Sequence, residues 1–221
     1  MLLEFFLIIF LGYNIMGQIY KANITVGRLF VPESRIIADL MLKGTSAEEW
    51  KKAVEVDNIL QKLSVESTKR IATFIRARLE LMTPELWEII RDGSYTSATH
   101  ATFSAAIKHS RILGDYLDLV IREQFRHLED HLTLRLWDDF ISGCKQRDPD
   151  MNFSERTIKN LRTVVHNILA EVGYIKSTRT PELQKVSIEP DVMNYLKDKN
   201  EQYVLRCIQV GSTPLKCGDK Y

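Results

Sequence analysis

Apolar residues recur every three or four positions through most of the chain, which is the spacing of helices that bury one face. Proline or a capping residue precedes most of these segments, and glycine or a short polar stretch follows many of them. Thr45 or Ser46 forms a capping-box pattern with Glu48 and Glu49. The pattern predicts helices over 32–42, from 46 past Val54, from 64 or 67 to 82, and over 84–92, 96–108, 110–128, 133–145 and 155–172. We therefore expect a protein of the all-α class.

The helix predicted over 155–172 has a polar side that is mostly basic. At about 100° per residue, one sector of this helix holds four basic residues, Arg156, Lys159, Arg162 and His166. Three neutral polar residues lie beside them: Asn160, Thr163 and Asn167. Aliphatic residues fill the opposite sector. A helix that contacts phosphates on one side and packs on a core with the other has this composition. A solvated surface helix has it too, so both interpretations stay open.

The residues after this helix have the order of a winged helix-turn-helix. Gly173 can adopt the left-handed conformation that ends a helix. A polar turn with Lys176 and Arg179 follows, and the stretch 183–188 then predicts a short strand. We therefore predict a winged-helix-like module in which Lys176 and Arg179 contact phosphate from the wing. Tyr174 is expected to pack on the core, with contact to a sugar-phosphate backbone as the alternative.

A second basic group lies in the helix predicted to begin at 64 or 67. Lys69, Arg70 and Arg76 are candidates for phosphate contact, with a solvated helix face as the alternative. Arg78 falls on the apolar side of the same helix. Because a buried guanidinium needs a compensating carboxylate, we expect Arg78 to form a structural ion pair.

The stretch Arg-Asp-Pro-Asp at 147–150 is the best candidate for a linker. It divides the chain into an N-terminal extension (1–23), a helical bundle (24–148), a winged-helix-like module (149–210) and a tail (211–221). The extension holds an apolar run from Phe5 to Leu11, which is too short to cross a bilayer because a spanning helix needs about 20 apolar residues. We expect residues 1–15 to derive from an upstream start codon, with a packed helix or an interfacial anchor as alternatives, and we expect no membrane association.

Charge and chemistry-bearing residues narrow the function further. The net charge is only +1, so affinity for nucleic acid has to come from a local basic surface. The three cysteines show no Cys-x-x-Cys pair and no histidine at zinc-binding spacing, so we expect neither a disulfide framework nor a metal site. No phosphate-binding loop or nucleophile motif is present. We expect His127 to be a core or interface histidine rather than a metal ligand, and we expect no catalytic residues and no cofactor.

Three segments of the chain form a combination that is typical of one family. They are Val26-Gly-Arg-Leu-Phe-Val-Pro-Glu-Ser-Arg-Ile-Ile-Ala, Ser67-Thr-Lys-Arg-Ile-Ala with the following Arg-x-Arg-Leu, and Ser154-x-x-Thr157 through Val172-Gly-Tyr-Ile. This combination resembles the BrxA family of BREX (bacteriophage exclusion) systems, over roughly Ile24 to Ile208. The resemblance implies an all-helical accessory protein, similar to the NusB/RsmB-type fold in its N-terminal part, that binds double-stranded DNA. It implies the methyltransferase, ATPase and phosphatase-like BREX components as partners.

Together these observations predict a non-catalytic, cytoplasmic protein that binds double-stranded DNA mainly through phosphate contacts. With few side chains arranged for base edges, we expect weak sequence preference and strong salt dependence. A protein–protein scaffold without nucleic-acid contact is the main alternative, and RNA binding, as in NusB-like folds, is the other. One continuous surface formed by helix 155–172, the wing and Lys69/Arg76 favours nucleic acid, whereas a scattered arrangement favours the scaffold.

Overall fold

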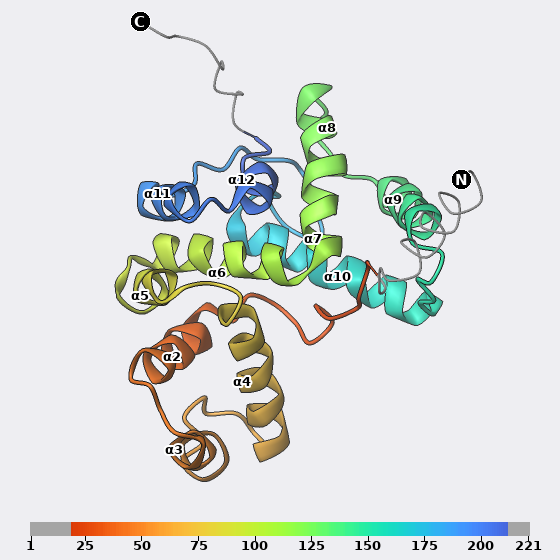
Figure 1. Cartoon of the computed structure of the whole chain (residues 1–221). Coiled ribbons are helices and arrows are strands. Elements are labelled where there is room, and N and C mark those ends of the chain that lie inside the picture. The colour runs from red at the N-terminus through yellow and green to blue at the C-terminus, as the bar shows by residue number, and fades with distance from the viewer. Residues whose placement is uncertain (1–18, 212–221) are drawn as a thin grey trace, which may run out of the picture.

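The structure, a computed structural model, describes residues 19–211 as a series of helices joined by loops (Figure 1). In chain order the elements are α2 (Val31–Leu42), α3 (Ala47–Lys51), η1 (Lys52–Val56), α4 (Val65–Leu79), α5 (Pro84–Asp92), α6 (Tyr95–His109), α7 (Arg111–Tyr116), η2 (Leu117–Ile121), α8 (Arg122–Arg126), α9 (Leu134–Arg147), α10 (Glu155–Val172), α11 (Pro190–Asp198) and α12 (Gln202–Ile208). The predicted all-α class is confirmed. The predictions about residues 1–18 and 212–221 fall outside the described residues. None of the helices between 19 and 211 is both long and apolar enough to cross a bilayer.

Capping residues set the helix ends where the sequence places them. Glu49 N donates to the Ser46 hydroxyl at 3.3 Å, and Ser46 N donates to the Glu49 carboxylate at 2.8 Å, so the predicted capping box of α3 is confirmed. The Ser64 and Ser154 hydroxyls cap α4 and α10. Gly173 ends α10 in the left-handed conformation, with φ of 96°. The predicted bounds of α10 are confirmed, whereas α4 ends before the predicted position 82.

Helix α6 lies at the centre of the fold. Every residue from 97 to 107 is buried, as expected for a helix with neighbours on all sides. Helices α2, α4 and α5 pack on one side of α6 and α11 and α12 on the other, and α10 crosses it (Figure 1). Buried side chains from Tyr20 to Val210 form one hydrophobic cluster, to which residues on both sides of the predicted linker contribute. The domain boundary near 148 stays a prediction.

The helix predicted over 110–128 is one continuous element made of α7, η2 and α8. Its middle, Leu117–Ile121, is a wider π-type turn. The helix ends just before His127, and Leu128 then turns the chain with φ of 57°. As a result, α8 extends past its neighbours at the top of Figure 1.

The strand predicted over 183–188 is wrong. The described residues pair only as two isolated β-bridges, one of which joins Leu183 to Ile175, and no ladder forms beyond Gln184. Pro190 then begins α11, in the first turn where its missing N–H costs nothing. Helices α11 and α12 are absent from the predicted elements, because the residues after the strand are assigned to the winged-helix-like module without helices of their own. Both helices pack against α6.

A buried carboxylate on α7 joins segments that are far apart in the sequence. The hydroxyls of Tyr20 and Tyr203 donate to the two oxygens of Asp115, at 2.8 and 3.0 Å. Arg111 Nε lies 2.9 Å from the same carboxylate and compensates its charge. Tyr203 also lies directly against the backbone of Gly114. Asp115 therefore holds the start of the described chain and α12 on α7.

We expect Gly114→Ala to destabilise the protein. A Cβ atom at this position would lie 2.1 Å from Tyr203 Oη, so the phenol would have to leave Asp115. A loss of roughly 1–3 kcal/mol in the free energy of unfolding is expected from such overpacking, measured by urea denaturation. Gly143→Ala in α9 is the control, because its Cβ would meet only Arg147 Nη1 at 3.7 Å, and it should gain up to about 1 kcal/mol. Equal stability of the two variants would contradict the tight contact.

Candidate nucleic-acid interface

Helix α10 turns its polar side to solvent because its aliphatic side is fixed in the core. Arg156 and Lys159 are exposed, and Arg162 is half-buried. No carboxylate within residues 19–211 forms an ion pair with any of the three. Their positive charge is therefore available to an external anion.

The predicted position of His166 in this basic sector is wrong. Its side chain is only 9% exposed, and Tyr116 Oη lies 3.4 Å from its Nε2. The imidazole also packs edge-on against Trp137, with ring centroids 6.3 Å apart. Burial lowers the pKa of His166 to about 4, and the nearby Arg162 adds to this effect. A neutral, buried ring packs in the core and contributes no charge to the surface.

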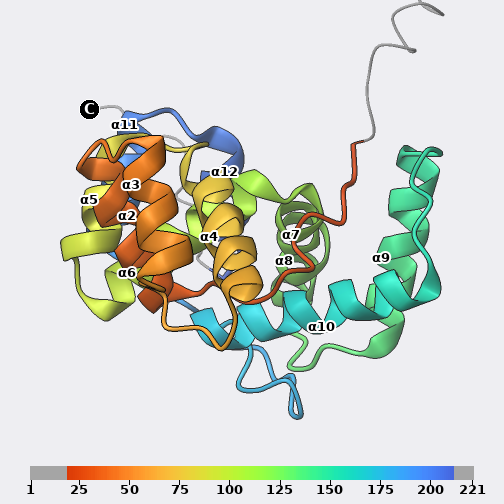
Figure 2. The same ribbon diagram turned by 90° about the horizontal axis from the view of Figure 1, so that it is seen from below.

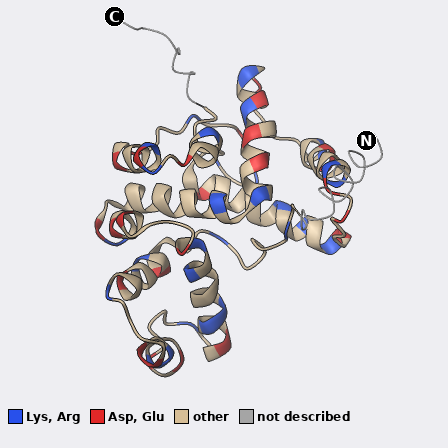
Figure 3. Cartoon of the chain, in the orientation of Figure 1, with Lys and Arg blue, Asp and Glu red and all other residues tan. Residues whose placement is uncertain are grey.

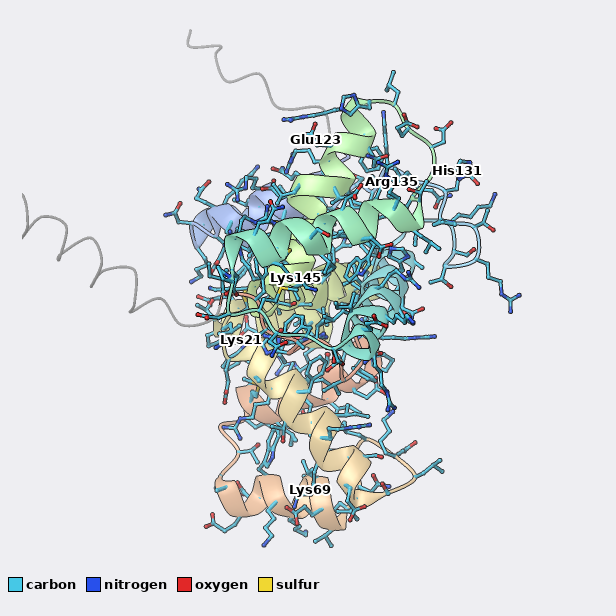
Figure 4. All side chains as sticks on the ribbon, turned by 90° about the vertical axis from the view of Figure 1, so that its right-hand side faces the viewer. Lys21, Lys69, Glu123, His131, Arg135 and Lys145 are labelled. Atoms are coloured by element: carbon cyan, nitrogen blue, oxygen red, sulfur yellow. The ribbon has the colours of Figure 1, made fainter. Side chains whose placement is uncertain are left out.

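The loop that follows α10 lies on the same side of the molecule as α10. Figure 2 shows loop 176–185 extending below α10, and Figure 4 shows both at the right-hand edge. Lys176 Nζ pairs with Glu182 at 3.1 Å across this loop. Arg179 is exposed, and no described carboxylate pairs with it. The structure thus places the loop that carries Arg179 beside α10, although the loop contains no strand.

The basic residues of α4 are largely engaged within the protein. Lys69 Nζ lies 3.0 Å from Glu55, and Arg76 Nε lies 2.7 Å from Glu80. Arg70 is exposed, and no carboxylate in the described part of the chain pairs with it. Two of the three predicted phosphate contacts on α4 therefore already have a partner, although exposed pairs of this kind are weak and can exchange.

Arg76 is also held by an aromatic contact at a surface cavity. Its guanidinium lies over the Trp50 ring, 4.7 Å from the ring centroid. The cavity has a volume of about 270 Å³ and lies among α2, α3, α4 and α5; its lining residues are Leu40, Met41, Gly44, Thr45, Trp50, Arg76, Glu80 and Trp87.

The predicted basic residues form two separate groups rather than one surface. Lys69 lies toward the lower end of the molecule in Figure 4, away from α10 and loop 176–185. Figure 3 shows acidic and basic residues interspersed on most other helices, in keeping with the net charge of +1. The structure therefore joins α10 to the loop and leaves α4 apart.

Two cations that the sequence analysis missed lie at the start of the described chain and on α9. Tyr20 N donates to the Asp148 carboxylate at 2.8 Å, which places Lys21 near the end of α9, where Lys145 lies (Figure 4). Both lysines are exposed, and neither pairs with a described carboxylate. They are 124 residues apart in sequence, so no local pattern could have joined them.

Arg78 is buried, as predicted, but its predicted ion pair is wrong. Its side chain is 1% exposed, and Nη1 donates to Arg28 O at 3.1 Å. The guanidinium lies 3.9 Å from the centre of the Phe74 ring, while Nε and Nη2 find no partner among the described residues. Burial lowers the pKa of Arg78 to about 9, and the charge of Glu171 opposes this shift. A cation–π contact and a more distant carboxylate thus replace the direct pair.

Tyr174 packs in the core, as predicted. Its side chain is fully buried, its ring lies 5.8 Å from that of Phe103, and its hydroxyl donates to Ile208 O. Contact between this ring and a nucleic-acid backbone is therefore excluded in this structure.

The histidine and acidic residues at the end of α8 do not form a metal site. The described residues include no group of three or more His, Cys, Asp or Glu side chains that could hold a metal ion. His127 does not lie in the core, one of its two predicted positions, because its side chain is 69% exposed and lies 3.9 Å from Glu123; the interface position stays a prediction. The helix ends just before His127, which frees the ring from the core.

We expect the stability of the protein to fall between pH 6.5 and pH 4, in part through His166. Its pKa is about 4 in the folded chain and about 6.5 when unfolded, so the unfolded state binds the proton first as the pH falls. The loss should be roughly 2–3 kcal/mol for this residue. His166→Gln should start from lower stability but show a flatter pH dependence in denaturation. An imidazole resonance of His166 that titrates near 6.5 in NMR would contradict this prediction.

Comparison with known proteins identifies the family. The family model BrxA matches residues 18–200. The chain is 50% identical over 192 residues to the BREX protein BrxA of Paramagnetospirillum magneticum, covering 86% of this chain and 96% of that protein. It is 28% identical over 184 residues to the BREX protein BrxA of Escherichia coli O9:H4, covering 83% and 86%. The crystal structure of an uncharacterized protein from Magnetospirillum magneticum superimposes with a TM-score of 0.80 at 48% identity, over 86% of this chain and 98% of that one. The chain belongs to the BrxA family.

Proposed function

We propose that this chain is a non-catalytic accessory protein of a BREX phage-defence system that binds double-stranded DNA mainly through phosphate contacts. Its family supports the assignment to BREX. The observation that carries the DNA contact is α10, an 18-residue helix with three basic residues that no described carboxylate neutralises. Cations of this kind bind phosphates with release of condensed counterions, which makes the affinity fall with salt.

In this proposal α10 and loop 176–185 act together. Arg156, Lys159 and Arg162 contact phosphates along the helix, and Lys176 and Arg179 contact them from the loop. Because α10 and the loop share one side of the molecule, a duplex can meet both at once (Figure 2). This arrangement corresponds to a winged-helix-like module over 149–210 whose wing is a loop without a strand.

The residues on α4 contribute a secondary contact in this proposal. Arg70 is free of described ion pairs, whereas Lys69 and Arg76 have to exchange their glutamate partners for phosphate. We further propose that the helical part 24–148 corresponds to the NusB/RsmB-like bundle. The protein would act in the cytoplasm with the methyltransferase, ATPase and phosphatase-like components of BREX.

The second candidate function is a protein–protein scaffold of the BREX assembly. The observation in its favour is the separation of the basic groups, because a scattered arrangement suits contacts with several acidic partner surfaces (Figure 3). RNA binding, which the NusB-like resemblance suggests, is the third. These candidates differ in their ligand, so one binding experiment distinguishes them.

We expect Arg156→Ala/Lys159→Ala/Arg162→Ala to weaken binding to a labelled random duplex roughly tenfold or more, because it removes three phosphate contacts. The slope of log K against log salt should fall by about 2.7. Fluorescence anisotropy at several salt concentrations measures both, and circular dichroism and thermal unfolding check the fold. The matched control is Lys69→Ala/Arg70→Ala/Arg76→Ala, which removes the same charge from α4 and should have a much smaller effect.

Other outcomes separate the alternatives. No binding of the wild-type protein to duplex DNA at low salt contradicts the proposal and leaves the scaffold. Tighter binding to RNA than to duplex DNA of the same length favours the RNA alternative. An equal loss in the two triple variants would place α4 in the main contact.

A further inference from the structure

Four polar residues form a row along the exposed side of α10. They bear on which DNA sequences the protein prefers, a question that rests on the proposed DNA binding. We propose that Arg156, Asn160, Thr163 and Asn167, here called the α10 row, contact base edges in the major groove and give the protein a sequence preference. Arg156 has five N–H donors, so it can contact a base edge in addition to its proposed phosphate. The purely phosphate-based binding expected from the sequence would then be only part of the interaction.

The geometry of the α10 row matches the groove. Its members stand at positions i, i+4, i+7 and i+11, so they lie within about 60° of one another around the helix. Eleven residues at about 1.5 Å each span roughly 16 Å, which corresponds to about five base pairs. The major groove is about 12 Å wide and admits an α-helix. Arg156, Asn160 and Thr163 are exposed, and Asn167 is half-buried at the end nearer the core.

The row is also free to bind. The carboxamides of Asn160 and Asn167 have no hydrogen-bond partner among the described residues, and Arg156 has no ion pair there. Thr163 donates its hydroxyl proton to Lys159 O at 3.1 Å, so its oxygen can still accept. On α4, by contrast, Lys69 and Arg76 are paired with glutamates.

The side chains of the row fit purine edges. A carboxamide donates to N7 and accepts from N6 of adenine, and a guanidinium donates to O6 and N7 of guanine. Asn160 and Asn167 are about 10 Å apart along the helix axis, or about three base-pair steps. We therefore expect a short site of about five base pairs with two adenines separated by roughly this spacing and a guanine near Arg156.

The positively charged residues near the α10 row are proposed to contact phosphates rather than bases. At about 100° per residue Lys159 lies to one side of the row, and Arg179 belongs to the loop that follows α10. We expect both to contact the phosphates that flank the groove. Contacts of this type fix the position of the helix without reading sequence. A change in the row should therefore alter which sequences bind, and a change in Lys159 should alter how tightly all sequences bind.

The test is selection from a randomised duplex pool by the full chain, followed by affinity measurements on the enriched and a scrambled duplex. We expect the wild-type protein to enrich a short purine-containing motif and to bind it about tenfold more tightly than the scrambled duplex. Asn160→Ala/Asn167→Ala should lose most of this preference while its affinity for the scrambled duplex and its salt slope stay unchanged. Both substitutions favour the helix, so the variant should fold; its melting temperature checks this.

The matched control is Lys159→Ala. It should weaken binding to both duplexes by the same factor and lower the salt slope by about 1. Salt-dependent binding without an enriched motif would overturn the inference and leave the proposed DNA binding intact. A motif that the double asparagine variant still prefers would overturn the assignment to the α10 row. If the wild-type protein binds no duplex at all, both this inference and the proposed function fail.

Discussion

The burial of one side of α10 is the constraint on which the candidate surface depends. The helix is 18 residues long, and its aliphatic residues repeat along its whole length, so only one rotation about its axis removes them from water. That rotation fixes the direction of every other residue on the helix. The cations and amides face solvent because the core holds the opposite side, and they need no contact of their own to stay there. A rigid helix with its polar side presented in this way has little conformational entropy to lose when it binds a ligand.

The distribution of ion pairs matters more for this protein than its total charge. A net charge of +1 gives no long-range attraction for nucleic acid, so a binding surface has to arise where cations lack acidic neighbours. The structure separates these cases: glutamates accompany Lys69 and Arg76, whereas no described carboxylate pairs with Arg156 or Lys159. The same residue types thus have different roles on the two helices. Membership of the BrxA family is compatible with binding to nucleic acid and with binding to other proteins, because it does not show which surface of the chain is used.

Sequence patterns within a few residues predicted many of the helices and their ends, whereas features that depend on contacts between distant segments were missed. The capping box at Ser46 and the glycine stop at Gly173 act over a few residues, and both are confirmed. The strand over 183–188 failed because a strand needs a partner, and composition does not reveal whether one exists. His166 shows the same limit for the candidate site: the helical wheel places it in the basic sector, whereas Trp137 from α9 and Tyr116 from α7 pack against it in the core. The Lys69–Glu55 ion pair was equally invisible, since the carboxylate of Glu55 comes from η1. The Arg76–Glu80 pair, by contrast, joins residues four positions apart and is a local signal.

The contact of Asp115 with Tyr20 and Tyr203 has a consequence for how the chain is made. Asp115 lies near the middle of the sequence, and its two phenol partners come from close to either end of the described chain. Helix α6 likewise depends on a segment far along the chain, because α12 packs against its buried side chains. Synthesis delivers about 5–20 residues per second from the N-terminus, so α6 and Asp115 emerge before α12 is made. Until α12 is added, the nascent chain leaves one side of α6, and one oxygen of the Asp115 carboxylate, without the contacts that α12 provides.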